Sequence, residues 1–227
     1  MEEQVRLFGF GSPTGIDLPY EFGGALPSKA LKKQLADDGA ISKEEGRAFY
    51  VGDNVQFAIG QGLLSATPIQ LAVAYSALAN GGSVVTPHVV KAILVPGTPD
   101  GDSGFIDIAQ MVVEKDFTQG RIQREIDMKK ENRDPIVNGL RRVIEGKGVD
   151  FGYYHKATGE LLFKNYARKT LPIAGKTGTA QGFGNLPWND SSAFGAFSLS
   201  PRAEYKYAAF AYLEKSGYGS QAAAPVV

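Results

Sequence analysis

The side chains best suited to binding chemistry lie together in one short segment, PIAGKTGTAQ at residues 172–181. Its first half is apolar, which predicts a strand, and its second half offers the ammonium of Lys176 and the hydroxyls of Thr177 and Thr179. Threonine is compatible with a strand, and Gly178 between the two lets another backbone approach closely. We therefore expect a strand edge that receives an extended ligand, with the hydroxyls gripping an anionic or carbonyl group. From this segment alone, a buried strand that ends in one exposed lysine is an equal alternative.

The tripeptide Gly175-Lys176-Thr177 also resembles the end of a phosphate-binding P-loop. Such a loop requires another glycine five positions before its last glycine. Thr170 occupies that position, and no helix-forming pattern follows the segment. The sequence therefore excludes a P-loop.

The overall composition indicates one good-sized globular domain or two small ones, because 43% of the 227 residues are hydrophobic. Lys plus Arg and Asp plus Glu both number 24, so the formal charge is zero. No run of like charges is present, so nucleic acid is not an expected partner. Three basic pairs are interpreted as solvated faces: Lys32-Lys33, Lys129-Lys130 and Arg141-Arg142.

The sequence also limits metal, disulfide and membrane chemistry. It contains no cysteine, which excludes a disulfide scaffold and a thiolate zinc site. His88 and His155 lack ligand-like spacing, so both are predicted to be structural, and no metal or cofactor is expected. No apolar run approaches the length of a membrane helix, and the first residues do not form a signal peptide. We expect the chain as given to be soluble.

A strong helix is predicted from Thr67 to Asn80. Thr67 and Gln70 have the spacing of a capping box, and Pro68 suits the first helical position. Gly81-Gly82 tolerate left-handed geometry at its end. The predicted apolar stripe comprises Leu71, Ala74, Tyr75 and Leu78.

Weaker patterns lie on either side of this helix. Before it we predict an ordered loop at 1–28, a short helix at 28–38, a helix opened by a Ser42/Glu45 capping box, and an alternating polar and apolar segment at 52–62. After it we predict strands at 84–85 and 89–95, a hairpin or loop region at 96–133, a helix that begins at Asp134-Pro135, and a small hairpin that turns at Lys156–Glu160. The core face of this second helix is predicted to comprise Ile136, Val137, Leu140, Val143 and Ile144.

The strand at 172–181 is predicted to be part of an antiparallel sheet with two further strands. They lie near 193–199 and 205–214 and are joined by a turn at 200–204. A loop between the first two strands carries Trp188, which is interpreted as a packing or cleft-rim residue. Ser220 is predicted to cap a final helix.

Three segments resemble the transpeptidase domain of class B penicillin-binding proteins, nearest to the elongation type. They are residues 8–19, residues 52–82 with Gly60-Gln61-Gly62 and Thr67-Pro68-Ile69-Gln70-Leu71, and residues 174–181 with the following hairpin. The resemblance implies an α+β fold, in which five antiparallel strands carry helices on both faces. It also implies acyl transfer without a cofactor. In that family, a serine in Ser-x-x-Lys attacks the D-Ala-D-Ala amide of a peptidoglycan stem peptide. The acyl group then passes to an amine on a neighbouring stem, and β-lactams acylate the same serine.

The resemblance assigns a role to each residue of the Lys-Thr-Gly-Thr segment. Lys176 would supply positive charge and hold a proton-relay partner. Thr177 and Thr179 would bind the terminal carboxylate of the donor peptide or the β-lactam, and Gly178 would keep the edge clear for strand addition. The backbone N–H of Thr179 would be one of two oxyanion donors.

The sequence departs from the family pattern because no serine is followed three places on by lysine, and Ser-x-Asn is also absent. In the family both motifs precede the segment that matches residues 8–19. We therefore expect residues 1–227 to be the C-terminal portion of one transpeptidase domain, incomplete at both ends and inactive by itself. The strand at 205–213 would then be an unpaired edge that aggregates or pairs with another chain.

Two alternative functions stay open. One is a non-catalytic regulatory or scaffolding module, and the other is a fragment of a serine β-lactamase or β-lactam sensor, which the Gly60-Gln61-Gly62 segment disfavours. The implied partners are stem peptides and β-lactams, with a missing N-terminal anchor that holds the parent protein at the extracytoplasmic face of a bacterial plasma membrane.

Gln61 is interpreted as a structural turn residue. Ser65 and Thr67 are interpreted as hydrogen bonders at the helix start rather than nucleophiles.

Overall fold

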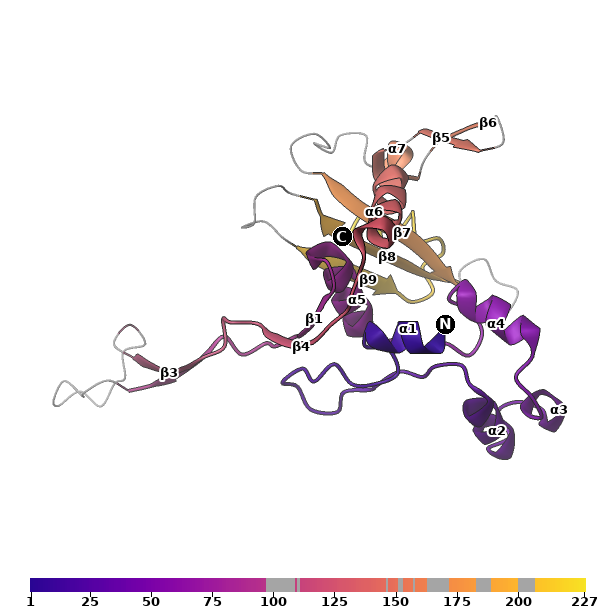
Figure 1. Cartoon of the computed structure of the whole chain (residues 1–227), viewed down its shortest axis with the longest axis horizontal. Helices are drawn as coiled ribbons and strands as arrows, with labels where there is room; N and C mark the ends of the chain where they lie inside the picture. Colours follow the sequence, from indigo (N-terminus) through magenta and orange to yellow (C-terminus); the bar gives the residue numbers. More distant parts are fainter. Residues whose placement is uncertain are drawn as a thin grey trace.

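The computed structural model describes residues 1–96, 109, 111–145, 147–150, 153–156, 158–162, 172–182, 189–199 and 207–227 (Figure 1). The described helices are α1 (Glu2–Leu7), α2 (Lys29–Asp37), α3 (Lys43–Gly46), α4 (Val51–Ala58), α5 (Pro68–Asn80), α6 (Lys130–Glu145) and α7 (Thr158–Leu162). The described strands are β1 (Ser83–Thr86), β2 (Ala92–Val95), β3 (Val112–Asp116), β4 (Arg121–Glu125), β5 (Lys147–Asp150), β6 (Tyr153–Lys156), β7 (Ile173–Ala180), β8 (Ser191–Ser198) and β9 (Ala208–Leu213). The α+β class and all three predicted strands of the antiparallel sheet are confirmed.

The core of the fold is an antiparallel sheet in the order β7-β8-β9, with a helix on each face. Side chains alternate between the faces of β8. Phe194 points to the face where it clusters with Ile144 of α6. Phe197, on the opposite face, meets the ring of Tyr75 of α5 with centroids 6.4 Å apart. Burial raises the pKa of Tyr75 to about 12, so this ring stays neutral in the core.

Helix α5 begins and ends as predicted, but its buried face was predicted only in part. Thr67 accepts a hydrogen bond from the backbone of Gln70, the Gln70 side chain closes the capping box, and Gly81 ends the helix with a left-handed φ of 93°. The buried residues are Gln70, Val73, Ala74 and Ala77, which include only Ala74 of the predicted stripe, although Tyr75 also packs on the sheet. The helix is apolar on nearly all sides because it packs on the sheet and also on β1, so hydrophobic periodicity could not identify one buried face.

Helix α6 begins one turn before the predicted start at Asp134, and Pro135 lies inside it. The guanidinium of Arg133 donates to the carbonyls of Leu78 at 2.8 Å and Ala79 at 2.9 Å, at the end of α5. These charge-assisted bonds satisfy terminal carbonyls and fix the extra turn. Of the predicted core face only Ile144 is buried, and Ile136 is 50% exposed.

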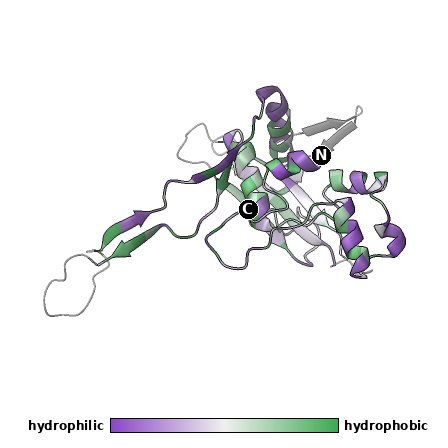
Figure 2. Cartoon of the chain, turned by 60° about the horizontal axis from the view of Figure 1, so that its bottom comes forward, coloured by the Kyte–Doolittle hydropathy of each residue, from purple (hydrophilic) through white to green (hydrophobic). Residues whose placement is uncertain are grey.

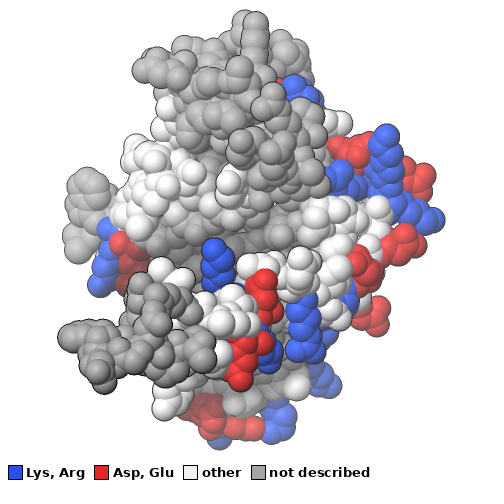
Figure 3. Space-filling view, turned by 90° about the vertical axis from the view of Figure 1, so that its left-hand side faces the viewer, with Lys and Arg blue, Asp and Glu red and all other residues white. Residues whose placement is uncertain are grey.

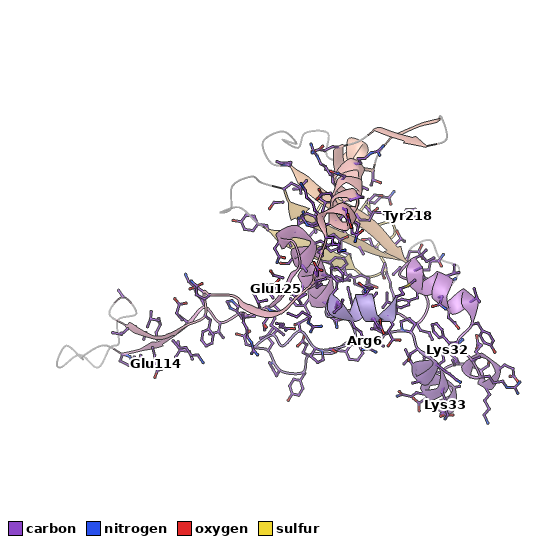
Figure 4. All side chains as sticks on the ribbon, in the orientation of Figure 1. Arg6, Lys32, Lys33, Glu114, Glu125 and Tyr218 are labelled. Atoms are coloured by element: carbon purple, nitrogen blue, oxygen red, sulfur yellow. The ribbon has the colours of Figure 1, made fainter. Side chains whose placement is uncertain are left out.

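The interpretation of Lys32-Lys33 as a solvated pair is wrong for Lys32, which is 5% exposed. Its Nζ donates to Asp53 Oδ2 at 2.8 Å and lies 4.8 Å from the centre of the Tyr50 ring. This bond, with a second from the Tyr50 N–H, lowers the pKa of Asp53. Lys33 is exposed and pairs with Asp37 (Figure 4). The ion pair joins α2 to α4 beside a cavity of about 180 Å³, lined by Pro27, Lys32, Ile41, Glu45, Asp53, Gln56, Gly62 and Leu63.

Four further local predictions differ from the structure. The loop at 1–28 begins with helix α1, and the alternating segment at 52–62 contains helix α4. β5 pairs with β6 along Lys147–Asp150 and Tyr153–Lys156, so the predicted turn is wrong, because Lys156 is the end of β6 and Thr158 is the start of α7. No α-helix follows Ser220 in residues 219–227, where the backbone forms turns and Pro225 cannot continue a helix. The capping boxes of α3 and α5 are confirmed, as is the helix predicted at 28–38, which Ser28 caps. Trp188 and the turn at 200–204 lie outside the described residues.

A long two-stranded arm extends from the body of the protein (Figure 1). β1 pairs with β4 at its base, and β2 pairs with β3 further out, both antiparallel. The outer pair contains hydrophobic residues (Figure 2), which include Ile93, Leu94, Val112 and Val113, each at least 41% exposed. The strands predicted at 84–85 and within 89–95 are therefore present, as parts of this arm.

Two carboxylates hold the N-terminal loop: Asp17 joins it to the arm, and Glu21 closes the loop on itself. Asp17 accepts from the N–H groups of Val89 at 2.7 Å and Val90 at 2.9 Å, and these bonds lower its pKa. Glu21 accepts from the N–H of Thr14 at 2.7 Å and from that of Gly15 at 2.9 Å. Burial opposes ionisation of Glu21, but bonds from Thr14 and Gly15 outweigh it, and the pKa of Glu21 is lowered.

We predict that Glu21→Gln removes a stabilising contribution that depends on pH. A depressed folded-state pKa stabilises the fold above the unfolded value of 4.5, and this contribution is lost as pH falls through the folded-state pKa. Urea unfolding of the wild type and Glu21→Gln should therefore differ at pH 7 and converge at acid pH. The control is Glu114→Gln on exposed β3, which should follow the wild type throughout. A constant gap between wild type and Glu21→Gln down to pH 3 would contradict the prediction.

Candidate functional site

Strand β7 carries the predicted site and lies at one edge of the sheet. Its register with β8 pairs Lys176 with Gly195 and Thr179 with Ser192. No second strand of the described chain pairs with its other side. The predicted strand is therefore confirmed, and its outer side is open as far as the described residues extend.

The hydrogen-bond parity of this pairing determines which backbone groups face the open edge. Leu199 N–H donates to Pro172 O at 2.7 Å, which makes 172 and 199 a hydrogen-bonded pair. Because such pairs alternate in an antiparallel ladder, Lys176 and Gly178 bond to β8. The N–H and C=O groups of Thr177 and Thr179 point away from β8, toward the open edge. The Thr179 N–H, which the resemblance assigns as an oxyanion donor, is therefore directed outward.

The side chains of the segment flank this edge from both faces of the strand. Lys176 is exposed, and its Nζ donates to the outward carbonyl of Thr177 at 2.7 Å. No ion pair joins Lys176 to a carboxylate in the described ranges. Thr177 and Thr179 are half-buried on the opposite face of the strand. An extended ligand at the edge would have the ammonium on one side and the hydroxyls on the other.

Thr179 receives two contacts from segments distant in sequence. The N–H of Gly219 donates to its hydroxyl oxygen at 3.4 Å, and Gln61 Nε2 donates to its carbonyl at 3.4 Å. Because the hydroxyl oxygen accepts from Gly219, its own O–H remains directed elsewhere and can donate to a ligand. Tyr218, labelled in Figure 4, precedes Gly219 in this turn and is 62% exposed. Gln61 was interpreted as a turn residue only; its glycine neighbours were the available signal, but nothing in the sequence revealed its contact with β7.

Glycine is required where this turn crosses the sheet. A Cβ on Gly219 would lie 2.2 Å from Gly178 O and 2.5 Å from Ala193 O. Both are backbone atoms of paired strands and cannot move aside cheaply. A Cβ on Gly178 itself would meet the Ala193 side chain at 3.3 Å. The turn therefore lies directly on β7 and β8, next to Thr179.

Several described hydroxyl-bearing residues outside β7 make structural contacts. Thr67 caps α5, as predicted, and Ser65 exchanges backbone hydrogen bonds with Ala25 at 2.8 and 2.9 Å. Ser192 is fully buried, and its hydroxyl accepts from the Ser216 hydroxyl at 2.9 Å. His88 Nδ1 lies 3.0 Å from the carbonyl of Val90.

Charge and metal chemistry do not mark another site in the described part of the chain. Basic and acidic side chains are interspersed on the face drawn in Figure 3. Within the described ranges no group of three or more His, Asp or Glu side chains could hold a metal ion. None of the described helices combines the length and apolar character that a membrane crossing requires.

The whole chain, residues 1–227, matches the family described as the penicillin-binding protein transpeptidase domain. A relative named peptidoglycan D,D-transpeptidase MrdA, from Acinetobacter baumannii, is 31% identical over 187 residues, which cover 80% of this chain and 21% of the relative. The protein of that name from Haemophilus influenzae is 29% identical, over 98% of this chain and 30% of the relative. The chain thus spans less than a third of the length of these relatives.

Solved structures of similar proteins share the fold. The structure of Pseudomonas aeruginosa PBP2 in complex with WCK 5153 aligns with a TM-score of 0.64 and 29% identity, over 98% of this chain and 40% of that one. The Helicobacter pylori penicillin-binding protein PBP2 aligns with a TM-score of 0.62 and 25% identity, over 99% of this chain and 33% of that one.

We predict that Gly219→Ala destabilises the protein by about 1–3 kcal/mol, because the new methyl group clashes with two backbone carbonyls. Gly52→Ala is the matched control. A methyl group on Gly52, which lies in α4, would meet no atom within 4 Å, so this change should be neutral or stabilising by up to about 1 kcal/mol. Urea unfolding measures both. Equal stability of the two variants would show that the turn does not rest on β7 and β8.

Proposed function

This chain belongs to the penicillin-binding protein transpeptidase family, and we propose that it forms one wall of a peptidoglycan D,D-transpeptidase active site. The observation that carries the proposal is the open edge of β7, where Lys176 and two threonines flank outward backbone groups. The names of the relatives from Acinetobacter baumannii and Haemophilus influenzae support the same activity.

The proposed reaction is acyl transfer through a serine that lies outside residues 1–227. The serine oxygen attacks the carbonyl carbon of the D-Ala-D-Ala amide, and the C–N bond breaks as the terminal D-Ala leaves with a proton. An amine from a neighbouring stem peptide then attacks the resulting ester, forms the cross-link and releases the serine. A β-lactam reacts by the same attack, with its ring amide in place of the peptide amide.

In this proposal the donor peptide lies along β7 like an added strand. The outward N–H groups of Thr177 and Thr179 bind its backbone, and the hydroxyls of the two threonines hold its terminal carboxylate. Gly178 has no side chain and leaves the edge clear. The ligand therefore takes the place of a fourth strand at this end of the sheet.

Two charged or polar groups act on the reaction itself. The Thr179 N–H is one of two donors to the developing oxyanion, and loss of such a donor costs about 10²–10³ in rate. The Lys176 ammonium contributes positive charge and holds a group that relays the serine proton. Both groups act by position and charge, so no cofactor takes part in the proposed reaction.

A second proposal concerns the opposite edge of the sheet. β9 pairs only with β8 among the described residues, and Tyr212 on this strand is 41% exposed. We propose that a strand from outside residues 1–227 pairs with β9, because an unpaired strand edge promotes association. Residues 1–227 alone would then aggregate or pair with another chain.

Because the proposed substrate is cell-wall peptide, we also propose that the complete protein lies at the extracytoplasmic face of the membrane.

We predict that a fluorescent penicillin does not label residues 1–227 alone, but labels one to one a protein in which they are joined to the family's Ser-x-x-Lys segment. In that protein, Lys176→Ala should slow labelling at least about a hundredfold, because it removes charge and proton-relay support. Lys91→Ala, an exposed lysine on the arm, is the control and should label at the wild-type rate.

Three outcomes would overturn the proposal. Covalent labelling of residues 1–227 alone would place the nucleophile within them. Wild-type labelling by Lys176→Ala would remove Lys176 from the site. Rapid hydrolysis of the bound label would instead favour a β-lactamase.

A further inference from the structure

Gln61 lies on a turn whose backbone presents its side chain in a fixed direction. Gly60 and Gly62 on either side have left-handed φ angles of 74° and 73°. A Cβ on Gly60 would meet no atom within 4 Å, so glycine is needed there for its conformation rather than for space. The Gln61 N–H donates to Gln56 O at 2.9 Å and anchors the turn to the end of α4.

The side chain of Gln61 reaches the open edge of β7. Its Nε2 lies 3.4 Å from Thr179 O, across a sequence separation of 118 residues. Because the acceptor is a carbonyl, the NH₂ end of the amide must face it. The parity of the β7–β8 pairing directs this carbonyl away from β8, so Gln61 bonds to the same edge that a ligand would occupy.

Thr179 is restrained on both sides of the strand. On the inner side, Gly178 and Ala180 make the ladder bonds to β8, and each shares a peptide group with Thr179. On the outward side, the Thr179 N–H and C=O are restrained by what lies at the edge. Gln61 restrains the carbonyl, and Gly219 restrains the hydroxyl. With both contacts present, the backbone rotation of Thr179 is limited, and with it the direction of its N–H.

We propose that Gln61 is a positioning residue for acyl transfer, which holds the Thr179 carbonyl so that the Thr179 N–H points at the oxyanion. The inference rests on the function proposed above. It replaces the interpretation of Gln61 as a turn residue only. A donor that is misaligned by about 1 Å can lower a reaction rate by about a hundredfold, so a side chain that never touches substrate can control the rate.

The test uses a protein in which residues 1–227 are joined to the family's Ser-x-x-Lys segment. Gln61→Met keeps the length of the side chain but removes its donor. The matched control is Gln56→Met, the same change on an exposed residue of α4 whose side chain makes no hydrogen bond to β7 in the described structure. Stopped-flow labelling with a fluorescent penicillin separates the dissociation constant of the initial complex from the acylation rate constant.

For Gln61→Met we expect the acylation rate constant to fall about ten- to a hundredfold, while the dissociation constant changes less than about threefold and the midpoint of thermal unfolding stays within about 2 °C of wild type. Gln56→Met should match the wild type in all three quantities. A purely structural role would instead lower the unfolding midpoint and weaken initial binding, and this result overturns the inference. An unchanged acylation rate constant also overturns it. If the penicillin does not label the wild-type protein, the proposed function itself is wrong. That outcome differs from the two results that overturn only the role of Gln61.

Discussion

The outer side of β7, which no described strand pairs with, is the constraint on which the rest of the structure depends. Backbone N–H and C=O groups need hydrogen-bond partners, and in β7 those of Thr177 and Thr179 face away from β8. An edge of this kind invites another strand. In the proposed function, the surrounding elements keep this edge accessible to a peptide and limit the motion of its backbone groups.

The central strand, β8, limits the motion of β7. Phe194 of β8 packs with α6, and Phe197 of β8 packs with α5 on the opposite face, so one helix packs on each face of this strand. The turn at Gly219 lies on β7 and β8 from the α6 side, which is possible only without a side chain at that position. Gln61 approaches from the edge itself. Thr179 is thus restrained by three segments that are far apart in the sequence.

Local features of the fold were predictable from the sequence, and features set by tertiary contacts were not. The caps of α3 and α5 and the strand at 172–181 follow from short-range patterns of residues such as Ser42, Thr67 and Pro68. The start of α6 depends on Arg133 binding the end of α5, 54 and 55 residues away, and no local pattern contains that contact. The sequence was interpreted to show Lys32 as solvated, because its ion-pair partner Asp53 lies in another helix. The contact between Gln61 and Thr179 escaped prediction for the same reason, although its two glycines marked an unusual turn.

The most direct test of the open edge is residue-resolved amide hydrogen exchange along β7, measured by NMR in the absence of ligand. The ladder predicts alternation: the amides of Lys176 and Gly178, bonded to β8, should be protected, while those of Thr177 and Thr179 should exchange at least about tenfold faster. Equal protection of all four amides would mean that another element already pairs with this edge. No peptide could then dock there, and the proposed site would be wrong.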